Sequence, residues 1–395
     1  MLPASQPDGD AAEALQASTV ADPATTARSS RKVASFVEQF PISDIQPVWT
    51  TLTELGRAYT DLLDQAGRPS SSALHSQTPS GIAKLMATQL HAQPEIRILD
   101  PACGAARLLV EVAREQIEQH RDPNGLKYVG QEVDPNLAFL GALHLMLHGV
   151  VDFEIRVEDS LLQSTVKARD FDRVVGDPPV ALAIPHLGSE LQGDVRWAFG
   201  GTSLPKTADW LFLQHGLVAL KPGGRAVFIT AHGPMFRSGA EAAIRRDLLA
   251  AGWVSAVVAL PSALYPNLAL PLVMTVFDRP EGGARGHQDV LMIDASGLGT
   301  REGRVKVLPE KVRQQLTTLI QERNPSEPYA TLVESERIFE NKEAWQPNQY
   351  LDFETDQTRD LTVIEAELQQ QLEHLKAVEG DLQQAFGALP HGPLG

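Results

Sequence analysis

Two short segments hold the residues whose types and spacing could do chemistry. The segment Asp177-Pro-Pro-Val180 follows an apolar run and joins a carboxylate to two prolines. An aromatic amine is a poor nucleophile because its lone pair is delocalised into the ring. The Asp177 side chain and the Pro178 carbonyl could each accept an N–H of such an amine, which would position it by preorganised electrostatics. The alternative interpretation of Asp177-Pro-Pro is a plain turn between a strand and a loop.

The other segment, Ile96 to Arg107, predicts a buried strand that runs through a glycine turn into a helix. Asp100 ends the strand, and Gly104 permits a tight turn whose amides face a ligand. A glycine turn alone is weak evidence for a cofactor site, because many α/β folds have one. Acids also end the next two predicted strands: Glu132 could accept both hydroxyls of a ribose, and Asp159 could accept a proton of an adenine amino group. Alternatively, these acids only cap the strand ends.

Alternating strand and helix patterns surround both segments and predict an α/β fold. The expected strands are 96–99, 128–131, 153–157, 173–175, 226–230, 254–260 and 272–277, with a further strand at 290–293. The expected helices are 106–119, 137–147, 208–220 and 240–251, and Thr78-Pro79-Ser80 opens another, with Ile82, Leu85, Met86 and Leu90 on one side. Seven strands with crossover helices predict a mostly parallel sheet, with the ligand beyond the carboxyl ends of the strands.

Composition narrows the function classes. The chain has 395 residues, 43% of them hydrophobic, which is enough for a large core. The net charge of −16 argues that a partner supplies much of any contact with DNA. The single cysteine, Cys103, excludes a disulfide framework and a cysteine-built zinc site. We expect a cytoplasmic protein without a membrane span, because we find neither a signal peptide nor an apolar run of roughly 18 residues.

The two ends of the chain differ from its middle. We predict a disordered leader over residues 1–32, a small helical N-terminal subdomain over 33–71 and the main α/β domain over 72–355. A coiled-coil helix over 356–388 and a tail over 389–395 follow. The coiled coil is predicted by leucines seven residues apart, at Leu361, Leu368, Leu375 and Leu382. The alternative is a helix packed back on its own domain.

Taken together, these stretches resemble the modification subunit of type I restriction–modification systems, the adenine-N6 DNA methyltransferases. The resemblance covers about residues 72–355. It rests on Thr78-Pro79, Asp100-Pro-Ala-Cys-Gly104, Gly130-Gln-Glu132 and Asp177-Pro-Pro179, followed in family order by Ala208 to His215, Leu220 to Arg225, Phe236 to Glu241 and Ile293 to Ser296.

The resemblance implies the fold of class I S-adenosylmethionine-dependent methyltransferases, Rossmann-like with a seven-stranded sheet. It implies that S-adenosylmethionine is held by Thr78, Pro79, Asp100, Ala102, Gly104, Glu132, Asp159 and Asp177. It also implies that Asp177, Pro178, Pro179 and Val180 act on an adenine flipped out of DNA. A separate specificity subunit reads the DNA in that family. We expect it to dock on the helix 361–385, and the assembly to include a second copy of this chain; we expect no metal.

The chain departs from the family at identifiable positions. Gly104-Ala105-Ala106 replaces Gly-Ser-Gly, Val180 replaces an aromatic residue, Gln77 replaces the aromatic residue before Thr-Pro, and Asp177 replaces the commoner Asn. One hypothesis is that Trp197 or Phe199, in the loop 181–207, supplies the missing stacking face. The alternative is that both aromatic side chains pack that loop onto the domain.

Two other functions stay open. The same fold could methylate a small-molecule or peptide amine, which the acidic charge, Val180 and the short N-terminus favour. It could also belong to a catalytically silent assembly or regulatory protein. Cys103 is expected to be a small buried residue, and His144, His148 and His215 are expected to be ordinary core or surface histidines.

Overall fold

The computed structural model describes residues 49–66 and 77–351, apart from 185–190, 192, 202, 266–269, 283, 285 and 304. The expected leader, the coiled-coil helix with its docking segment 361–385 and the tail all lie outside the described residues, as does most of the expected N-terminal subdomain. The expected domain boundaries therefore stay predictions. No helix in the described ranges combines the length and the apolar character needed to cross a membrane.

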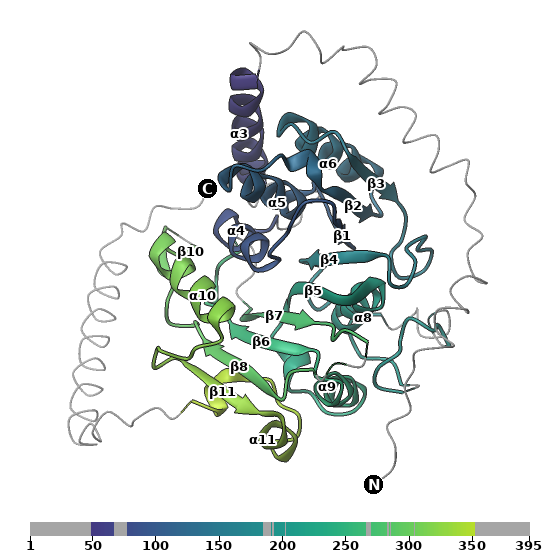
Figure 1. Ribbon diagram of the computed structural model, residues 1–395, viewed down its shortest axis with the longest axis vertical. Helices are drawn as coiled ribbons and strands as arrows, with labels where there is room; N and C mark the ends of the chain where they lie inside the picture. Colours follow the sequence, from purple (N-terminus) through teal and green to yellow (C-terminus); the bar gives the residue numbers. More distant parts are fainter. Residues whose placement is uncertain are drawn as a thin grey trace, which may run out of the picture. The chain divides into compact units, whose positions relative to one another are not determined.

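A nine-stranded sheet forms the centre of the fold. Its strands are β1 (Arg97–Asp100), β2 (Lys127–Glu132), β3 (Phe153–Val157), β4 (Phe171–Gly176), β5 (Leu220–Ala231), β6 (Val254–Ala259), β7 (Leu272–Asp278), β8 (Asp289–Asp294) and β11 (Ala330–Glu334). Figure 1 shows their order across the sheet, β11-β8-β6-β7-β5-β4-β1-β2-β3. The strands β9 (Thr300–Glu302) and β10 (Val305–Val307) form a separate antiparallel pair.

The direction of the strands decides where loops can meet. The strand β1 is parallel to β2 and β4, and the pairs β2–β3, β4–β5 and β6–β8 are also parallel. The strand β7 is antiparallel to both β5 and β6, so those two run in the same direction. The edge strand β11 is antiparallel to β8. The expected mostly parallel sheet is confirmed, and the loops after β1, β2, β4 and β6 leave the same edge.

Helices cover the two faces of the sheet because successive strand residues point to opposite faces. The helices are α3 (Trp49–Ala66), α4 (Ser80–Gln89), α5 (Arg107–Glu118), α6 (Pro135–Leu147), α8 (Asp209–Ala219), α9 (Ala240–Ala250), α10 (Glu310–Glu322) and α11 (Ser335–Glu340). Buried side chains of α4, α5 and α10 belong to one apolar cluster, whereas those of α8, α9 and α11 belong to another. The short β9, β10 and β11 and the helices α10 and α11 were not predicted from the sequence.

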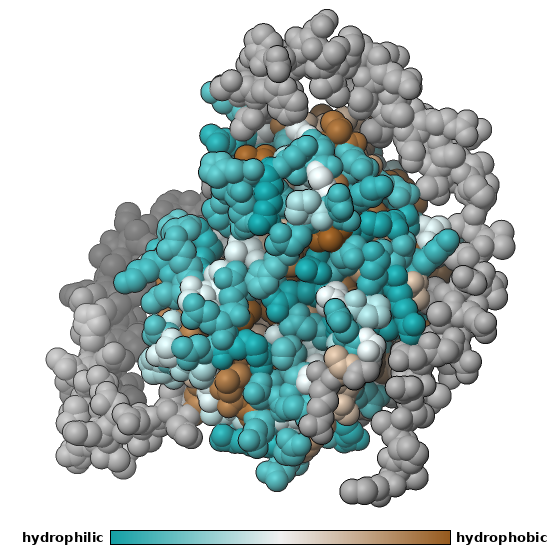
Figure 2. Space-filling view, in the orientation of Figure 1, coloured by the Kyte–Doolittle hydropathy of each residue, from teal (hydrophilic) through white to brown (hydrophobic). Residues whose placement is uncertain are grey.

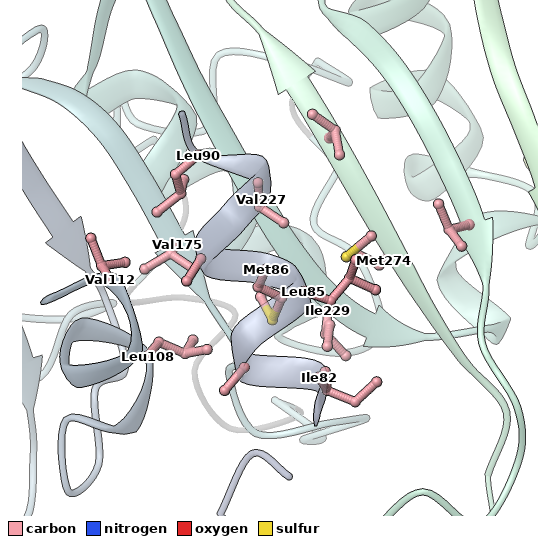
Figure 3. Packing of buried hydrophobic residues seen from close by; sticks show 14 of the residues in the cluster. Ile82, Leu85, Met86, Leu90, Leu108, Val112, Val175, Val227, Ile229 and Met274 are labelled. Carbon is pink, nitrogen blue, oxygen red and sulfur yellow. The ribbon is translucent and has the colours of Figure 1, made fainter. Parts of the chain in front are cut away.

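The helix α4 shows how the expected apolar pattern becomes packing. Figure 3 shows its apolar side directed toward α5 and the central strands, with Met86 and Leu85 near Ile229 and Met274. The four residues predicted for this side, Ile82, Leu85, Met86 and Leu90, are 0 to 2% exposed. This burial fixes the start of α4, and with it the position of the preceding Thr78.

The helix α3 packs on α6 at close range. A Cβ atom at Gly56 would lie 2.7 Å from the Leu147 carbonyl oxygen, so only glycine permits this approach. The Thr60 hydroxyl lies 2.8 Å from Nε2 of His144, whose Nδ1–H donates to the Ala105 carbonyl over 2.9 Å. Burial lowers the pKa of His144 to about 3, so the ring is neutral at pH 7. The helix α3 is thereby linked to the turn after β1.

The described part of the surface visible in Figure 2 is mainly hydrophilic, and hydrophobic residues form small separate areas on it. Exposed apolar side chains include Val133 and Phe139, at 66% and 61% exposed. Single exposed apolar residues are ordinary on protein surfaces. They therefore identify no partner.

Candidate functional site

A cavity of about 560 Å³ opens at the carboxyl ends of β1, β2 and β4. The expected site residues that line it are Thr78, Ala102, Gly104, Glu132, Asp159, Asp177, Pro178, Pro179 and Val180. The remaining two, Pro79 and Asp100, do not line it. Pro79 is the N-cap of α4, and Asp100 is buried behind the turn with 1% exposure. The structure therefore brings together most of the residues that the sequence singled out.

The turn after β1 is held by hydrogen bonds to acids and to the neighbouring strand. The Asp100 carboxylate accepts the Ala102 N–H over 3.1 Å, and Glu132 accepts the Gly104 N–H over 2.9 Å. The Cys103 N–H donates to the Gln131 carbonyl at 2.9 Å. Gly104 has φ +52°, and a Cβ atom there would meet nothing within 4 Å. The turn thus presents open space on its ligand side.

Burial changes the pKa of two acids at the site. Burial is the main cause that raises the pKa of Asp100 to about 8; the Ala102 N–H bond opposes this rise, and the nearby Asp177 and Glu132 contribute to it. Burial also raises the pKa of Glu132, against the N–H bonds from Asp134 and Gly104. A positively charged ligand group would stabilise the ionised form of each acid.

Asp159 has a local structural role as well as a place in the cavity wall. Its Oδ1 accepts the N–H groups of Leu161 and Leu162 over 2.9 and 3.1 Å. The alternative of a capping acid is therefore observed at this position. A carboxylate has about four acceptor positions, so capping leaves room for a ligand.

Asp177 follows β4, and two hydroxyl groups converge on one of its oxygens. Its Oδ2 accepts the Thr78 hydroxyl over 2.6 Å and the Tyr265 hydroxyl over 2.7 Å. Burial raises the pKa of Asp177 to about 6, although both hydrogen bonds lower it. No described residue donates to Oδ1. The carboxylate is thus fixed through one oxygen, and the other remains for a ligand.

Tyr265 is a site residue that sequence reasoning missed. It follows β6, and its buried ring lines the cavity beside Val180. The signal was an aromatic residue between two predicted strands, 254–260 and 272–277. An aromatic residue in that place can be recognised as a site residue only when β6 and β4 are known to end at the same edge of the sheet. Phe212 and Leu182 line the same cavity and were also missed.

The chain matches a known protein family over the region that forms the sheet and the cavity. The sequence profile of the family "N-6 DNA Methylase" matches residues 52–359, a range that includes the whole sheet and the cavity. The chain belongs to the N-6 DNA Methylase family.

Relatives of this family member include methylase subunits of type I restriction enzymes. It is 24% identical over 337 residues to the MjaVII methylase subunit of Methanocaldococcus jannaschii, across 82% of this chain and 56% of that protein. It is 28% identical over 236 residues to the HindI methylase subunit of Haemophilus influenzae, across 58% of this chain and 51% of that protein. The chain spans about half the length of these curated relatives.

Solved structures agree on the fold. The methyltransferase subunit of a type I restriction–modification system from Streptococcus thermophilus is 26% identical, with a TM-score of 0.67 over 76% of this chain and 64% of that one. A class I S-adenosylmethionine-dependent methyltransferase from Listeria monocytogenes is 20% identical, with a TM-score of 0.54 over 79% of this chain and 89% of that one. The expected family resemblance and the class I methyltransferase fold are confirmed.

In this N-6 DNA Methylase family member, the described part of the loop 181–207 packs onto the domain. Trp197 is 9% exposed in a cluster with Leu161 and Phe212, and its indole N–H donates to the Leu191 carbonyl over 2.9 Å. Phe199 contacts Trp253 edge to face, with ring centroids 5.4 Å apart. Neither aromatic ring lines the cavity. The stacking hypothesis for them is therefore not supported, and the packing alternative is confirmed.

Arg196 explains why this loop is held against the site. Its guanidinium donates to the carbonyls of Ser160 and Leu161, which directly follow Asp159, and pairs with the Asp194 carboxylate. The loop and the adenine end of the expected cofactor site thus share one buried cation.

Other departures from the family have visible consequences. Ala106 adopts φ 59° and ψ 29°, so the turn keeps its left-handed geometry without glycine, at a cost of about 1–2 kcal/mol. Val180 lines the cavity with an aliphatic surface, and the aromatic rings that line it are Phe212 and Tyr265.

The remaining candidates are structural, as expected. Cys103 is buried, and burial raises the pKa of its thiol well above its usual value. His215 contacts Gln131 over 2.8 Å, and burial beside Arg196 lowers its pKa to about 3. Within the described ranges, no cluster of His, Cys, Asp or Glu could hold a metal ion.

Proposed function

We propose that this chain is an S-adenosylmethionine-dependent N6-adenine DNA methyltransferase subunit that acts with a separate specificity subunit. The observation that carries the proposal is the Asp177 carboxylate, fixed through Oδ2 at a cavity wall and free of described donors at Oδ1. Membership of the N-6 DNA Methylase family supports the same reading.

The cavity residues fit S-adenosylmethionine. Behind the cavity wall, the buried Asp100 has a pKa of about 8, and a ligand that carries an ammonium and a sulfonium group would stabilise its ionised form. The open space over Gly104 leaves room at the turn. In this proposal Glu132 accepts hydrogen bonds from the ribose hydroxyls, and Asp159 accepts one from the adenine amino group. When bound, S-adenosylmethionine supplies an electrophilic methyl group.

The chain's own residues orient the amine and hold its protons. Oδ1 of Asp177 accepts one N–H, and the Pro178 carbonyl, stiffened by Pro179, accepts the other. This pairing favours a pyramidal nitrogen with its lone pair directed away from both acceptors. Thr78 and Tyr265 keep the carboxylate in place and favour its ionised form.

Binding of S-adenosylmethionine is expected to release protons between pH 7 and 9. The ligand's positive charge lowers the pKa of Asp100 from about 8, so a protonated fraction of Asp100 ionises. Calorimetry in buffers of different ionisation enthalpy measures this release, and Asp100→Asn is expected to abolish most of it. Apparent binding enthalpies that are equal in all buffers would contradict the prediction.

The acidity of the chain is one reason to propose an assembly with a partner. With a net charge of −16, the chain needs a partner to supply much of the phosphate contact. We propose that a specificity subunit docks on the segment 361–385, and that the assembly contains a second copy of this chain.

Comparison of methylomes tests the function. Deletion of the gene is expected to remove N6-methyladenine from one sequence motif, and the unchanged gene is expected to restore it. A gene with Asp177→Ala, expressed at the same level, is the matched control and is expected to restore nothing. A methylome that the deletion leaves unchanged excludes the DNA assignment in that host.

One observation favours a second candidate. Val180 offers no aromatic stacking face for a flipped base. A methyltransferase of a small-molecule or peptide amine would have less need of one. Binding of S-adenosylmethionine together with an unchanged methylome supports this candidate. Failure to bind S-adenosylmethionine supports a silent assembly protein.

A further inference from the structure

Gln77 is a polar residue of the cavity wall whose amide group lacks partners. Its side chain lines the cavity, and both Nε2 and Oε1 are buried without a hydrogen-bond partner among the described residues. Buried amide groups in proteins are almost always hydrogen-bonded, because leaving them unpaired costs free energy. Among the described residues, no other side-chain amide has both ends buried and unpaired. Gln89, the nearest parallel, donates through Nε2 to Thr317 over 3.2 Å.

The place of Gln77 connects it to the reacting end of the cavity. It directly precedes Thr78, whose hydroxyl donates to Asp177 over 2.6 Å. The burial of α4 against the core fixes this segment. An apolar side chain at this position would add no hydrogen-bonding group to the wall. A carboxamide in its place adds one acceptor and a donor group to the wall.

We propose that Gln77 is a ligand-binding residue whose amide pairs with a ligand edge that carries an N–H donor beside an acceptor. The inference rests on the proposed function and deepens it. Two ligand groups could take this amide. The edge of the target base offers a ring nitrogen that accepts from Nε2–H, while Asp177 and Pro178 hold its two amino N–H groups. The amino-acid end of S-adenosylmethionine offers an ammonium donor beside a carboxylate acceptor, which pair with both ends of the amide. The adenine of the cofactor is assigned to Asp159, at the end of a different strand.

The inference predicts that stability and binding change in opposite directions. Gln77→Met keeps the length and removes the unpaired amide, so the unfolding midpoint of the ligand-free chain is expected to rise by about 1–4 °C. Ligand affinity is expected to fall about tenfold, because about one hydrogen-bonded pair is lost. A residue that only supports the fold would lose stability and leave binding unchanged.

Two binding measurements distinguish the two sources of the ligand edge. Calorimetry of the full chain gives the affinity for S-adenosylmethionine. The chain purified with its bound partners gives the concentration of genomic DNA, prepared from the deletion strain, that half-saturates methyl incorporation. A tenfold loss in the first alone assigns Gln77 to the amino-acid end of the cofactor, and a loss in the second alone assigns it to the base.

Gln89→Met is the matched control. It removes a buried amide outside the cavity that has a partner, so the unfolding midpoint is expected to fall and both affinities to stay unchanged. The inference is overturned when Gln77→Met leaves both affinities unchanged, whatever the midpoint does. Failure of the unchanged chain to bind S-adenosylmethionine overturns the proposed function and this inference together.

Discussion

The rate of methyl transfer is expected to fall tenfold for each pH unit below about 6, because Asp177 must be ionised to accept an N–H from its substrate. Burial raises the pKa of Asp177 to about 6, so its ionised form is lost as the pH falls through that value. Its Oδ2 already accepts two hydroxyl donors. An added proton is therefore expected on Oδ1, which would then present a hydrogen to the amine instead of a lone pair.

Tyr265→Phe is expected to move this acidic limb to higher pH. The variant removes one of the two hydrogen bonds that lower the pKa of Asp177. A hydrogen bond to a charged group contributes about 1.5–3 kcal/mol, which corresponds to a shift of about one to two pH units. Near pH 9 the variant is expected to approach the unchanged rate. Profiles of kcat/KM between pH 5 and 9 measure the limb, since they report the free enzyme.

Variants of Asp177 itself identify the titrating group. Asp177→Ala is expected to lower the rate about 100-fold or more at every pH, because a preorganised acceptor is lost. Asp177→Asn keeps an acceptor but cannot titrate near pH 6, so its remaining activity is expected to lack the acidic limb. A limb that persists in Asp177→Asn assigns the titration to another acid, such as Glu132. An unmoved limb in Tyr265→Phe removes Tyr265 from the control of Asp177.

Local rules explain the part of the site that the sequence revealed. Asp100, Glu132, Asp159 and Asp177 each end or follow a predicted strand, and the parallel strands that carry them end at one edge. Strand ends are marked by the change from apolar to polar residues, so these positions needed no tertiary information. The same rule identified the turn at Gly104, whereas the apolar spacing after Thr78-Pro79-Ser80 predicted the helix α4.

Residues whose position depends on pairing order could not be found this way. Tyr265 reaches Asp177 because β7 inserts antiparallel between β5 and β6, which makes β6 run parallel to β5 and β4 and end at the same edge of the sheet. No local pattern states that order. The residue type of Trp197 left two interpretations open, stacking on the substrate or packing of the loop. The Arg196 contacts to the carbonyls after Asp159 hold the described part of that loop against the domain, which favours packing.

The short edge elements were missed for a different reason. The strand β11 has five residues, and its pairing with β8 gives it a structure that its own pattern does not demand. The helix α10 is amphipathic, with Leu316, Leu319 and Ile320 buried. It packs against α4, so its place is set by residues far away in the sequence.

Gly130→Ala is expected to destabilise the fold and the cofactor turn together. Gly130 lies in β2, where a Cβ atom would be 2.6 Å from Cys103 Sγ, 3.0 Å from Cys103 Cβ and 2.8 Å from Ile155 Cδ1. Cys103 belongs to the turn, so a methyl group at residue 130 has to displace either the turn or the neighbouring strand β3. Overpacking of this kind costs about 1–3 kcal/mol of unfolding free energy. A displaced turn also lengthens the bond from the Gly104 N–H to Glu132, so the affinity for S-adenosylmethionine is expected to fall at least about tenfold, by loss of about 1.4 kcal/mol.

Two further variants test whether the effect of Gly130→Ala acts through the turn. Gly297→Ala is the matched control, because a Cβ atom at Gly297 meets nothing within 4 Å, and its stability is expected to stay within about 1 kcal/mol of the unchanged chain. Cys103→Ala removes the nearest atom, so combining it with Gly130→Ala is expected to restore part of both the stability and the affinity. Chemical denaturation and calorimetry on the unchanged chain, the two single variants Gly130→Ala and Cys103→Ala, and the double variant give the coupling between residues 103 and 130. Purely additive effects would show that the new methyl group is accommodated through Ile155 instead, and that the turn does not depend on the glycine behind it.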